Sequence, residues 1–249
     1  MEEIFYSFII IFLLNAFAFF WAYSKQTDKI TDLTYNLSFI IIAWWAWYFY
    51  SSQSLKETLL VLMITMWAGR LGLFLFYRVN QMGRDKRFDT FRANFYGFLK
   101  FWILQTVSIG IISLPSILYL SKSEETHVWI AGAGLWLTGL IIETVADHQK
   151  NRFKKANPDK QYRKGIFKYI IYPNYLGEIL CWAGIYLYVF PSLRNWEVLS
   201  VISPMWIIFL LICISGIPLL ERMANKNYAN DPEYREYIRK TKKLIPWIY

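Results

Sequence analysis

The sequence predicts an all-α integral membrane protein with seven transmembrane helices. Of its 249 residues, 56% are hydrophobic and only 18% are charged, whereas a soluble domain has about 25% charged residues. The apolar residues form blocks long enough to cross a bilayer, which takes about 20 residues of helix, and short basic stretches separate these blocks. These features exclude a disordered chain and a disulfide-stapled secreted module, and they disfavour a soluble globular enzyme.

Seven apolar segments each predict one spanning helix. In chain order they cover residues 4–23, 33–50, 57–78, 98–121, 127–147, 174–192 and 198–220. The first follows an acidic start, with Glu2 and Glu3, rather than the basic start of a signal peptide, so we expect it to be a retained span. The sixth is the shortest and begins beside Pro173, a residue suited to the first turn of a helix.

The distribution of positive charge orients these helices. With the N-terminus outside, 23 of the 27 lysines and arginines fall in the tail or in and beside the loops after the first, third and fifth spans. Only Lys56, Lys122 and Arg194 fall on the opposite side. Because cytoplasmic segments carry such an excess of lysine and arginine, we predict a cytoplasmic C-terminus. A composition rich in Ile, Lys and Asn is typical of an AT-rich bacterial genome, so we expect this membrane to be the bacterial inner membrane.

The basic loop after the fifth span and the basic tail also carry aromatic and amide side chains, which attraction to anionic lipid does not require. These residues include Tyr162, Tyr169, Tyr172, Asn174, Tyr228, Tyr234 and Tyr237. Interleaved with cations, such groups suit a flat anionic ligand such as a nucleotide cofactor. Nucleic acid would favour a similar surface, but the loops are short and lie against a membrane, so we expect no nucleic-acid partner.

Ionisable residues also lie inside the predicted spans, where they are costly unless they are paired or face a wet cavity. They are Arg70, Glu143, Asp147 and Glu178. Their position toward one leaflet predicts a polar cavity that opens inward, and an Arg70–carboxylate pair that only locks the helices is the alternative. Cys181 and Cys213 lack the spacing of a zinc site, so we expect free thiols and no metal.

The run from Gly165 to Trp182 resembles the C-terminal signature of the steroid 5-alpha-reductase family, and it is similar to the bacterial members labelled DUF1295. The ending from Tyr234 to Tyr249 resembles the C-terminus of that family. Upstream, Gly69-Arg70 and Gly83-Arg84-Asp85 resemble its two arginine-bearing landmarks. The resemblance covers roughly residues 65–249, whereas residues 1–64 match only in hydropathy.

The resemblance implies a monomeric seven-helix reductase that uses NADPH to reduce a carbon–carbon double bond conjugated to a ketone in a lipid or steroid-like substrate. One membrane domain, 1–249, would place the helices of residues 1–97 on the substrate side. The helices, cytoplasmic loop and tail of residues 98–249 would form the cofactor chamber. The matching cofactor-binding positions are Arg84, Asp147, Tyr162, Arg163, Asn174, Trp182 and Arg222. We also expect Lys154, which lies at a matching place with a changed residue type, and Tyr237 of the tail to bind the cofactor. Arginines suit the phosphates, and amide or carboxylate groups suit the ribose and nicotinamide.

The catalytic acid departs from the family pattern. The family has a glutamate before the third span and a tyrosine three residues before the arginine that corresponds to Arg70, where this chain has Trp67. An indole N–H donates a hydrogen bond but is not a useful acid. Asp32, Asn36 and Glu57 are the candidates for the glutamate. We prefer Asp32 to Glu57, because the predicted topology places Asp32 on the same side as the cofactor loops.

Two other functions fit parts of the pattern. An S-adenosylmethionine-dependent membrane methyltransferase of the isoprenylcysteine or phospholipid type shares the helix-plus-tail chamber. Those enzymes show Arg-His-Pro where this chain has Ile171-Tyr172-Pro173, followed by Asn174, so we prefer the reductase. A non-enzymatic or transport-like membrane protein is the second alternative, but transporters place their sites at the membrane midplane, whereas the charged groups here lie toward one leaflet.

Overall fold

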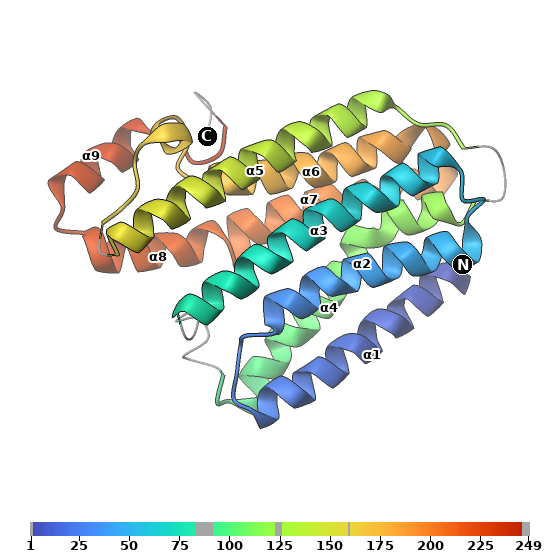
Figure 1. The fold of residues 1–249 in the computed structure, drawn as a ribbon, viewed down its shortest axis with the longest axis horizontal. Helices are drawn as coiled ribbons and strands as arrows, with labels where there is room; N and C mark the ends of the chain where they lie inside the picture. Colours follow the sequence, from blue (N-terminus) through green and yellow to red (C-terminus); the bar gives the residue numbers. More distant parts are fainter. Residues whose placement is uncertain (1, 83–91, 123–125, 159, 246–249) are drawn as a thin grey trace. The chain divides into compact units, whose positions relative to one another are not determined.

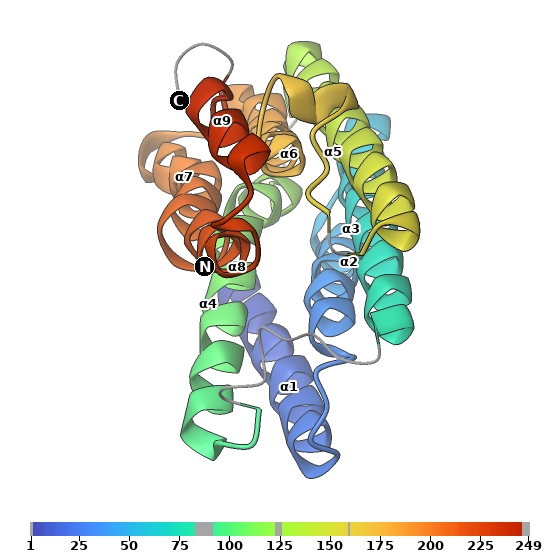
Figure 2. The same ribbon diagram turned by 90° about the vertical axis from the view of Figure 1, so that its left-hand side faces the viewer.

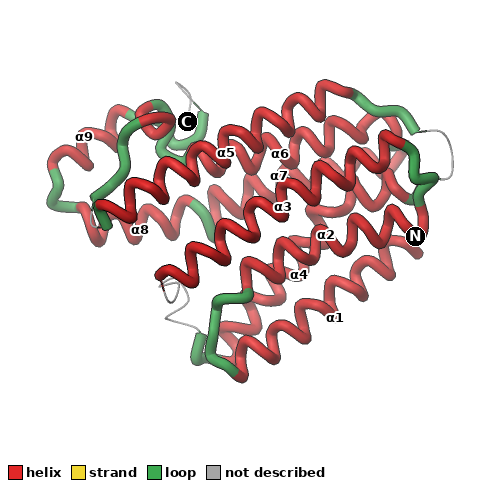
Figure 3. Tube along the Cα trace, viewed as in Figure 1, coloured by secondary structure: helices red, strands yellow, loops and turns green. Residues whose placement is uncertain are grey.

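The structure of the chain, a computed structural model, describes residues 2–82, 92–122, 126–158 and 160–245. Those residues are almost entirely helical, and they contain no named strand (Figures 1 and 3). The α-helices are α1 (Glu2–Ser24), α2 (Thr31–Tyr50), α3 (Leu55–Met82), α4 (Phe95–Leu120), α5 (Ile130–Ala156), α6 (Pro173–Val189), α7 (Ile202–Phe209), α8 (Ile217–Tyr228) and α9 (Pro232–Lys240). The predicted all-α class is therefore confirmed.

Among the described residues, five helical segments have the length and the apolar composition of membrane spans. They are Glu2–Ser24, Leu55–Gln81, Phe95–Leu120, Ile130–Ala156 and Asn195–Tyr228. Helices α2 and α6 coincide with the second and sixth predicted spans but do not belong to this set. Helix α6 has only 17 residues, and α2 contains Asn36, tryptophans and tyrosines that lower its hydropathy. The total of seven spans stays a prediction.

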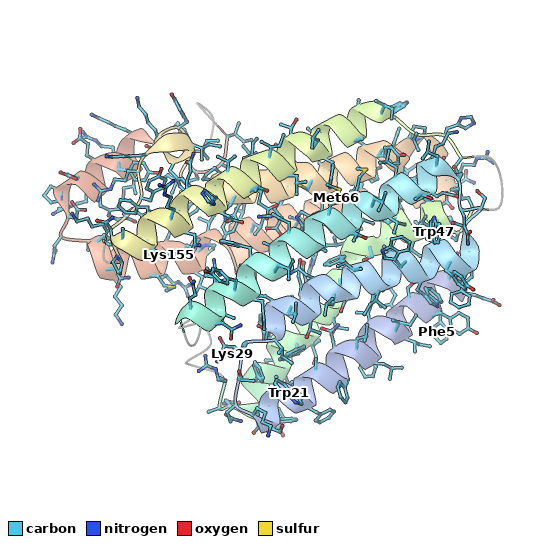
Figure 4. The ribbon with its side chains drawn as sticks, in the orientation of Figure 1. Phe5, Trp21, Lys29, Trp47, Met66 and Lys155 are labelled. Atoms are coloured by element: carbon cyan, nitrogen blue, oxygen red, sulfur yellow. The ribbon has the colours of Figure 1, made fainter. Side chains whose placement is uncertain are left out.

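The chain divides into two compact units. Unit 1 comprises Met1–Trp129 and Ile185–Ser203, and unit 2 comprises Ile130–Gly184 and Pro204–Tyr249. In unit 1, α2 packs against α1, α3 and α4. The outer surface of α1 is aromatic: Phe5 and Trp21 lie toward its two ends (Figure 4) and are 63% and 45% exposed. In a bilayer such side chains would contact lipid and its interface.

A buried polar bridge links α1, α2 and α4 within unit 1. The Asn15 amide oxygen accepts a hydrogen bond from Gln105 Nε2 at 2.8 Å, and Asn15 Nδ2 donates to Ser38 Oγ at 3.3 Å. All three side chains are buried, where an amide without a partner is costly. The bridge therefore favours one register of the three helices.

In unit 2, α5 and α6 approach each other at glycines. A Cβ atom on Gly139 would lie 2.6 Å from the carbonyl oxygen of Gly177, and one on Gly184 would lie 2.5 Å from Trp136 N. Even a methyl group does not fit at these positions, because the backbones of α5 and α6 are in direct contact. Such close approach is typical of small-residue contacts between membrane helices. Next to this contact, the Cys181 thiol lies 3.6 Å from the carbonyl oxygen of Trp136.

The last apolar segment of the chain is interrupted. A π-helical turn, η5 (Leu210–Ile214), follows α7, and Gly216 precedes α8 at a point where a Cβ atom would overlap the carbonyl oxygen of Leu211. The segment predicted as one span over 198–220 is thus not one continuous α-helix. Helix α8 runs on to Tyr228 and contains Arg222.

Candidate functional site

Two segments of unit 2, residues 160–172 and residues 231–245, pack together and form the loop–tail assembly. Figure 2 shows α9 beside the loop that precedes α6. A parallel β-bridge joins the segments, and Ile171 N donates a hydrogen bond to Lys242 O at 2.9 Å. An apolar cluster fastens the assembly to α8 and consists of Ile171, Tyr172, Ile217 and Leu244.

Tyr237 connects α9 to the loop. Its hydroxyl donates a hydrogen bond of 2.7 Å to the carbonyl oxygen of Phe167, which lies in the short 3-10 turn η2 (Gly165–Lys168). Burial raises the pKa of Tyr237 above its usual range, and the nearby Arg163 charge only partly opposes this effect. The hydroxyl therefore stays protonated and keeps its hydrogen bond at neutral pH.

Arg163 connects the loop to the start of α9 by two ion pairs. Its Nη2 atom contacts Asp231 Oδ2, and its Nη1 atom lies 3.0 Å from Glu233 Oε2. Asp231 also caps α9, because its Oδ1 accepts a hydrogen bond from Glu233 N at 2.9 Å. Partial burial opposes ionisation of the Asp231 carboxyl, but the hydrogen bond and charge of Arg163 outweigh it and lower the pKa of Asp231.

Tyr162 and Lys154 are held by aromatic neighbours. The Tyr162 ring lies 5.0 Å from the Phe153 ring and 5.3 Å from the Phe167 ring. Lys154 Nζ donates a hydrogen bond of 2.7 Å to the hydroxyl of Tyr228. Both side chains are half-buried, so the end of α5 presents an aromatic and cationic surface to the loop.

Gly165 allows the loop to turn beside α5. Its φ is +59°, and a Cβ atom there would overlap Gln149 Oε1. The same Gln149 oxygen accepts a hydrogen bond from Ile166 N at 3.2 Å. A residue with a side chain would be strained in this conformation and would displace Gln149.

Asn174 lies in the first turn of α6 and is half-buried. The helix begins at Pro173, so Tyr172 occupies the position that precedes it, and Leu176 N donates to the Tyr172 carbonyl oxygen at 3.2 Å. Asn174 is therefore not the N-cap. Within the described part of the chain its side-chain amide makes no hydrogen bond, which leaves its donor and acceptor groups available to a ligand.

The other predicted cofactor residues differ in exposure. Trp182 is buried in α6, and Asp147 is half-buried on α5, one turn after the buried Glu143. Arg222 is exposed on α8 and forms no ion pair with another described residue. Arg84 lies outside the described residues. Unit 2 thus contains all the predicted cofactor-binding residues except Arg84.

The predicted catalytic residues belong to unit 1. Trp67 is fully buried on α3, and its ring lies edge-on to that of Phe39 with a centroid distance of 5.5 Å. Phe39 is two turns along α2 from Asp32, which is about 10 Å of helix. Asp32 lies in the first turn of α2 and is half-buried.

Glu57 lies at the opposite end of the α2–α3 hairpin from Asp32 and forms a capping box. Its Oε2 accepts hydrogen bonds from Ser54 N at 2.8 Å and from Ser54 Oγ at 3.0 Å, while Ser54 Oγ lies 3.5 Å from Glu57 N. The spacing Ser-x-x-Glu is the usual sequence signature of this motif, and it would have revealed this helix start. The geometry gives Glu57 a structural reason to be buried.

Sequence reasoning did not identify Asp231, Glu233 or Gln149 as partners of the loop. Asp231 followed by Pro232 is a recognisable helix start, so α9 could have been placed from the sequence. The pairing of Asp231 with Arg163 could not have been predicted from the sequence, because 68 positions separate the two residues. Among the described residues, no cluster of three or more His, Cys, Asp or Glu side chains comes together that could hold a metal ion.

Comparison with known proteins identifies the family of this chain, which the geometry of the site does not identify. The profile of the family described as "Protein of unknown function (DUF1295)" matches residues 18–241. The chain belongs to the DUF1295 family. DUF1295 proteins are steroid 5-alpha-reductase-like, so the predicted resemblance is confirmed. No solved structure matches the chain significantly.

This DUF1295 chain is also similar to curated proteins. It is 29% identical to the 3-oxo-5-alpha-steroid 4-dehydrogenase 1 of Rattus norvegicus over 126 residues, which are 49% of this chain and 43% of the relative. It is 30% identical to the Homo sapiens protein of the same name over 124 residues, 49% of this chain and 42% of the relative. An uncharacterized protein of Schizosaccharomyces pombe is 23% identical over 234 residues, 79% of this chain and 65% of the relative. The chain thus spans less than half the length of the dehydrogenases it matches.

Proposed function

We propose that the protein is a membrane-bound reductase that uses NADPH to reduce a carbon–carbon double bond conjugated to a ketone in a hydrophobic, lipid or steroid-like substrate. The observation that carries the proposal is the loop–tail assembly, which contains Tyr162, Arg163 and Tyr237. Asn174 belongs to the same unit, in the first turn of α6. The relationship to steroid dehydrogenases favours this reaction over methyl transfer. Helices with the composition of membrane spans fit a substrate that enters from the lipid phase.

The residues of unit 2 fit a nucleotide cofactor in their chemistry. Arg222 is exposed and without an ion pair among the described residues, so its guanidinium is available to a phosphate. The Asn174 side-chain amide makes no hydrogen bond to another described residue, and it can donate and accept at once, as a carboxamide partner requires. Bound NADPH would supply the hydride, and the protein residues would bind and orient it.

The protein residues must also stabilise the substrate oxygen. Negative charge would develop on the ketone oxygen during such a reduction, and a preorganised donor that meets this charge is worth a few kcal/mol, roughly 3–4 in one measured case. We propose Asp32 as the source of the proton. We propose that Trp67, which has no acidic hydrogen, shapes the apolar wall near Asp32.

Asn174→Ala tests the cofactor assignment. Each hydrogen bond contributes about 0.5–1.5 kcal/mol, so losing two should weaken NADPH binding by roughly fivefold to 150-fold. The measurement is a binding titration in detergent with NADPH, NADH and S-adenosylmethionine, and thermal unfolding reports folding. Asn80→Ala is the control, since Asn80 is exposed on α3 and its side-chain amide donates a hydrogen bond to Phe76 O of the same helix. Retained NADPH affinity in Asn174→Ala, or binding of S-adenosylmethionine instead, would refute the proposal.

A further inference from the structure

The side chain of Arg163 is engaged by carboxylates on the accessible surface of the loop–tail assembly. The Arg163 side chain is 20% exposed, and those of Asp231 and Glu233 are 35% and 87% exposed. Nη1 and Nη2 of Arg163 contact the two acids, whereas its Nε is buried and has no hydrogen-bond partner among the described residues. Because the Arg163 side chain is partly exposed and Glu233 is largely exposed, an anion from solvent can reach the terminal nitrogens of Arg163, although not the buried Nε.

A guanidinium presents the same N–H fork to a carboxylate and to a phosphate. Because both terminal nitrogens of Arg163 already contact carboxylates, a phosphate that binds there must displace at least one of them. Glu233 is the easier to displace, since it is largely exposed and pairs with only one cation among the described residues. Asp231 is held more firmly, because it also caps α9.

We infer that Asp231 and Glu233 occupy the place of a ligand phosphate on Arg163, and that a phosphate-bearing ligand exchanges with them and loosens the start of α9 from the loop. The inference rests on the proposed function for the identity of the ligand as NADPH. The exchange itself requires only a ligand that carries a phosphate group able to bind Arg163. While Asp231 and Glu233 are paired with Arg163, the loop–tail assembly cannot bind a phosphate there. Only the fraction of molecules in which Arg163 is released can bind it, so the two acids lower the apparent affinity for anions.

Glu233→Gln tests this exchange, because it removes the competing charge at a largely exposed position. Its affinity for NADPH should rise by about twofold to fivefold, which corresponds to the loss of one exposed ion pair. Asp231→Asn should act in the same direction, and it keeps the helix cap because asparagine caps as well as aspartate. Glu236→Gln is the matched control: it removes the same charge from the same helix, but Glu236 pairs with Lys240 at 2.5 Å and not with Arg163.

Hydrogen exchange of the backbone amides of residues 233–236, which follow Pro232, provides the second measurement. In the wild-type protein exchange should accelerate when ligand binds, and in Glu233→Gln it should already be faster without ligand. Unchanged or lower affinity in Glu233→Gln would overturn the inference, because the acids would then position Arg163 for the ligand instead of competing with it. An equal gain in Glu236→Gln would also overturn it, since general charge would explain the effect.

Titration with inorganic pyrophosphate separates this inference from the proposed function. Should the wild-type protein not bind NADPH, the proposed function fails. The exchange is still supported when pyrophosphate affinity rises in Glu233→Gln and not in Glu236→Gln. The same pyrophosphate affinity in the wild type and in Glu233→Gln would overturn the exchange independently of the cofactor.

Discussion

At the scale of single residues, one hydroxyl group joins the tail to the loop. The Tyr237 hydroxyl bonds to the Phe167 carbonyl oxygen, and burial raises the pKa of Tyr237 above the ordinary value of 10.0. A folded-state pKa raised above the unfolded value means that the stabilisation is complete below about pH 10 and is lost as the pH rises through the folded pKa. The tail therefore depends on a protonated tyrosine.

Tyr237→Phe should remove this hydrogen bond and its dependence on pH. We expect a loss of about 0.5–1.5 kcal/mol in the free energy of unfolding at neutral pH, because the Phe167 carbonyl oxygen loses its partner. Above about pH 10 the melting temperature of the wild type should fall more steeply than that of the variant. Tyr234 also has a pKa raised by burial, so Tyr234→Phe is a useful comparison. Parallel pH profiles for wild type and Tyr237→Phe would contradict the assignment.

Asp32 and Glu57 are distinguished by their surroundings. Asp32→Asn should slow the single-turnover oxidation of bound NADPH by an enone substrate by about 100-fold or more, the usual range for a general acid. Glu57→Gln should retain the rate, since the Glu57 carboxylate serves in a capping box with Ser54. Thermal unfolding of both variants reports folding. A wild-type rate in Asp32→Asn together with a slow Glu57→Gln would reverse the roles.

At the scale of helices, the α5–α6 contact depends on the absence of side chains. Gly139→Ala should destabilise the protein by about 1–3 kcal/mol, because the new Cβ atom must push apart two backbones that already touch. Gly134→Ala is the matched control on the same helix, since a Cβ atom there meets nothing within 4 Å. The measurement is thermal or denaturant unfolding in detergent. Equal stability of the two variants would show that α5 and α6 tolerate separation.

At the scale of the whole molecule, the charge asymmetry predicts its orientation in the membrane. We expect a cysteine at position 160 to be labelled only from the cytoplasm and one at position 194 only from the outside, in a background where exposed Cys213 is replaced by serine. Lys160 and Arg194 are both exposed, so reagent access depends on sidedness. Labelling of position 160 from outside would reject the seven-span topology.

The long helices α1 to α6 were predictable because they follow from a local requirement. A spanning helix must cover a fixed thickness of hydrocarbon, so the length of an apolar block such as 4–23 predicts the length of the helix. Helix α1 indeed extends over Glu2–Ser24. The family relationship was likewise readable from the contiguous run 165–182. Asn174 and Trp182 could be named from that run and the other candidate cofactor residues from the resemblance outside it, although the roles of all of them stay predictions.

The partners of those residues depended on the tertiary structure. Arg163 contacts Asp231, 68 residues away in the sequence, and Tyr237 bonds to Phe167, 70 residues away. No local sequence pattern predicts contacts over such separations. The contact between α5 and α6 at their glycines was equally unpredictable, because the sequence of each helix shows a small residue but not which helix packs against it. Charge and hydrophobic length are properties of a segment, so the chain order reveals them, whereas an ion pair or a backbone contact exists only when folding brings two distant segments together.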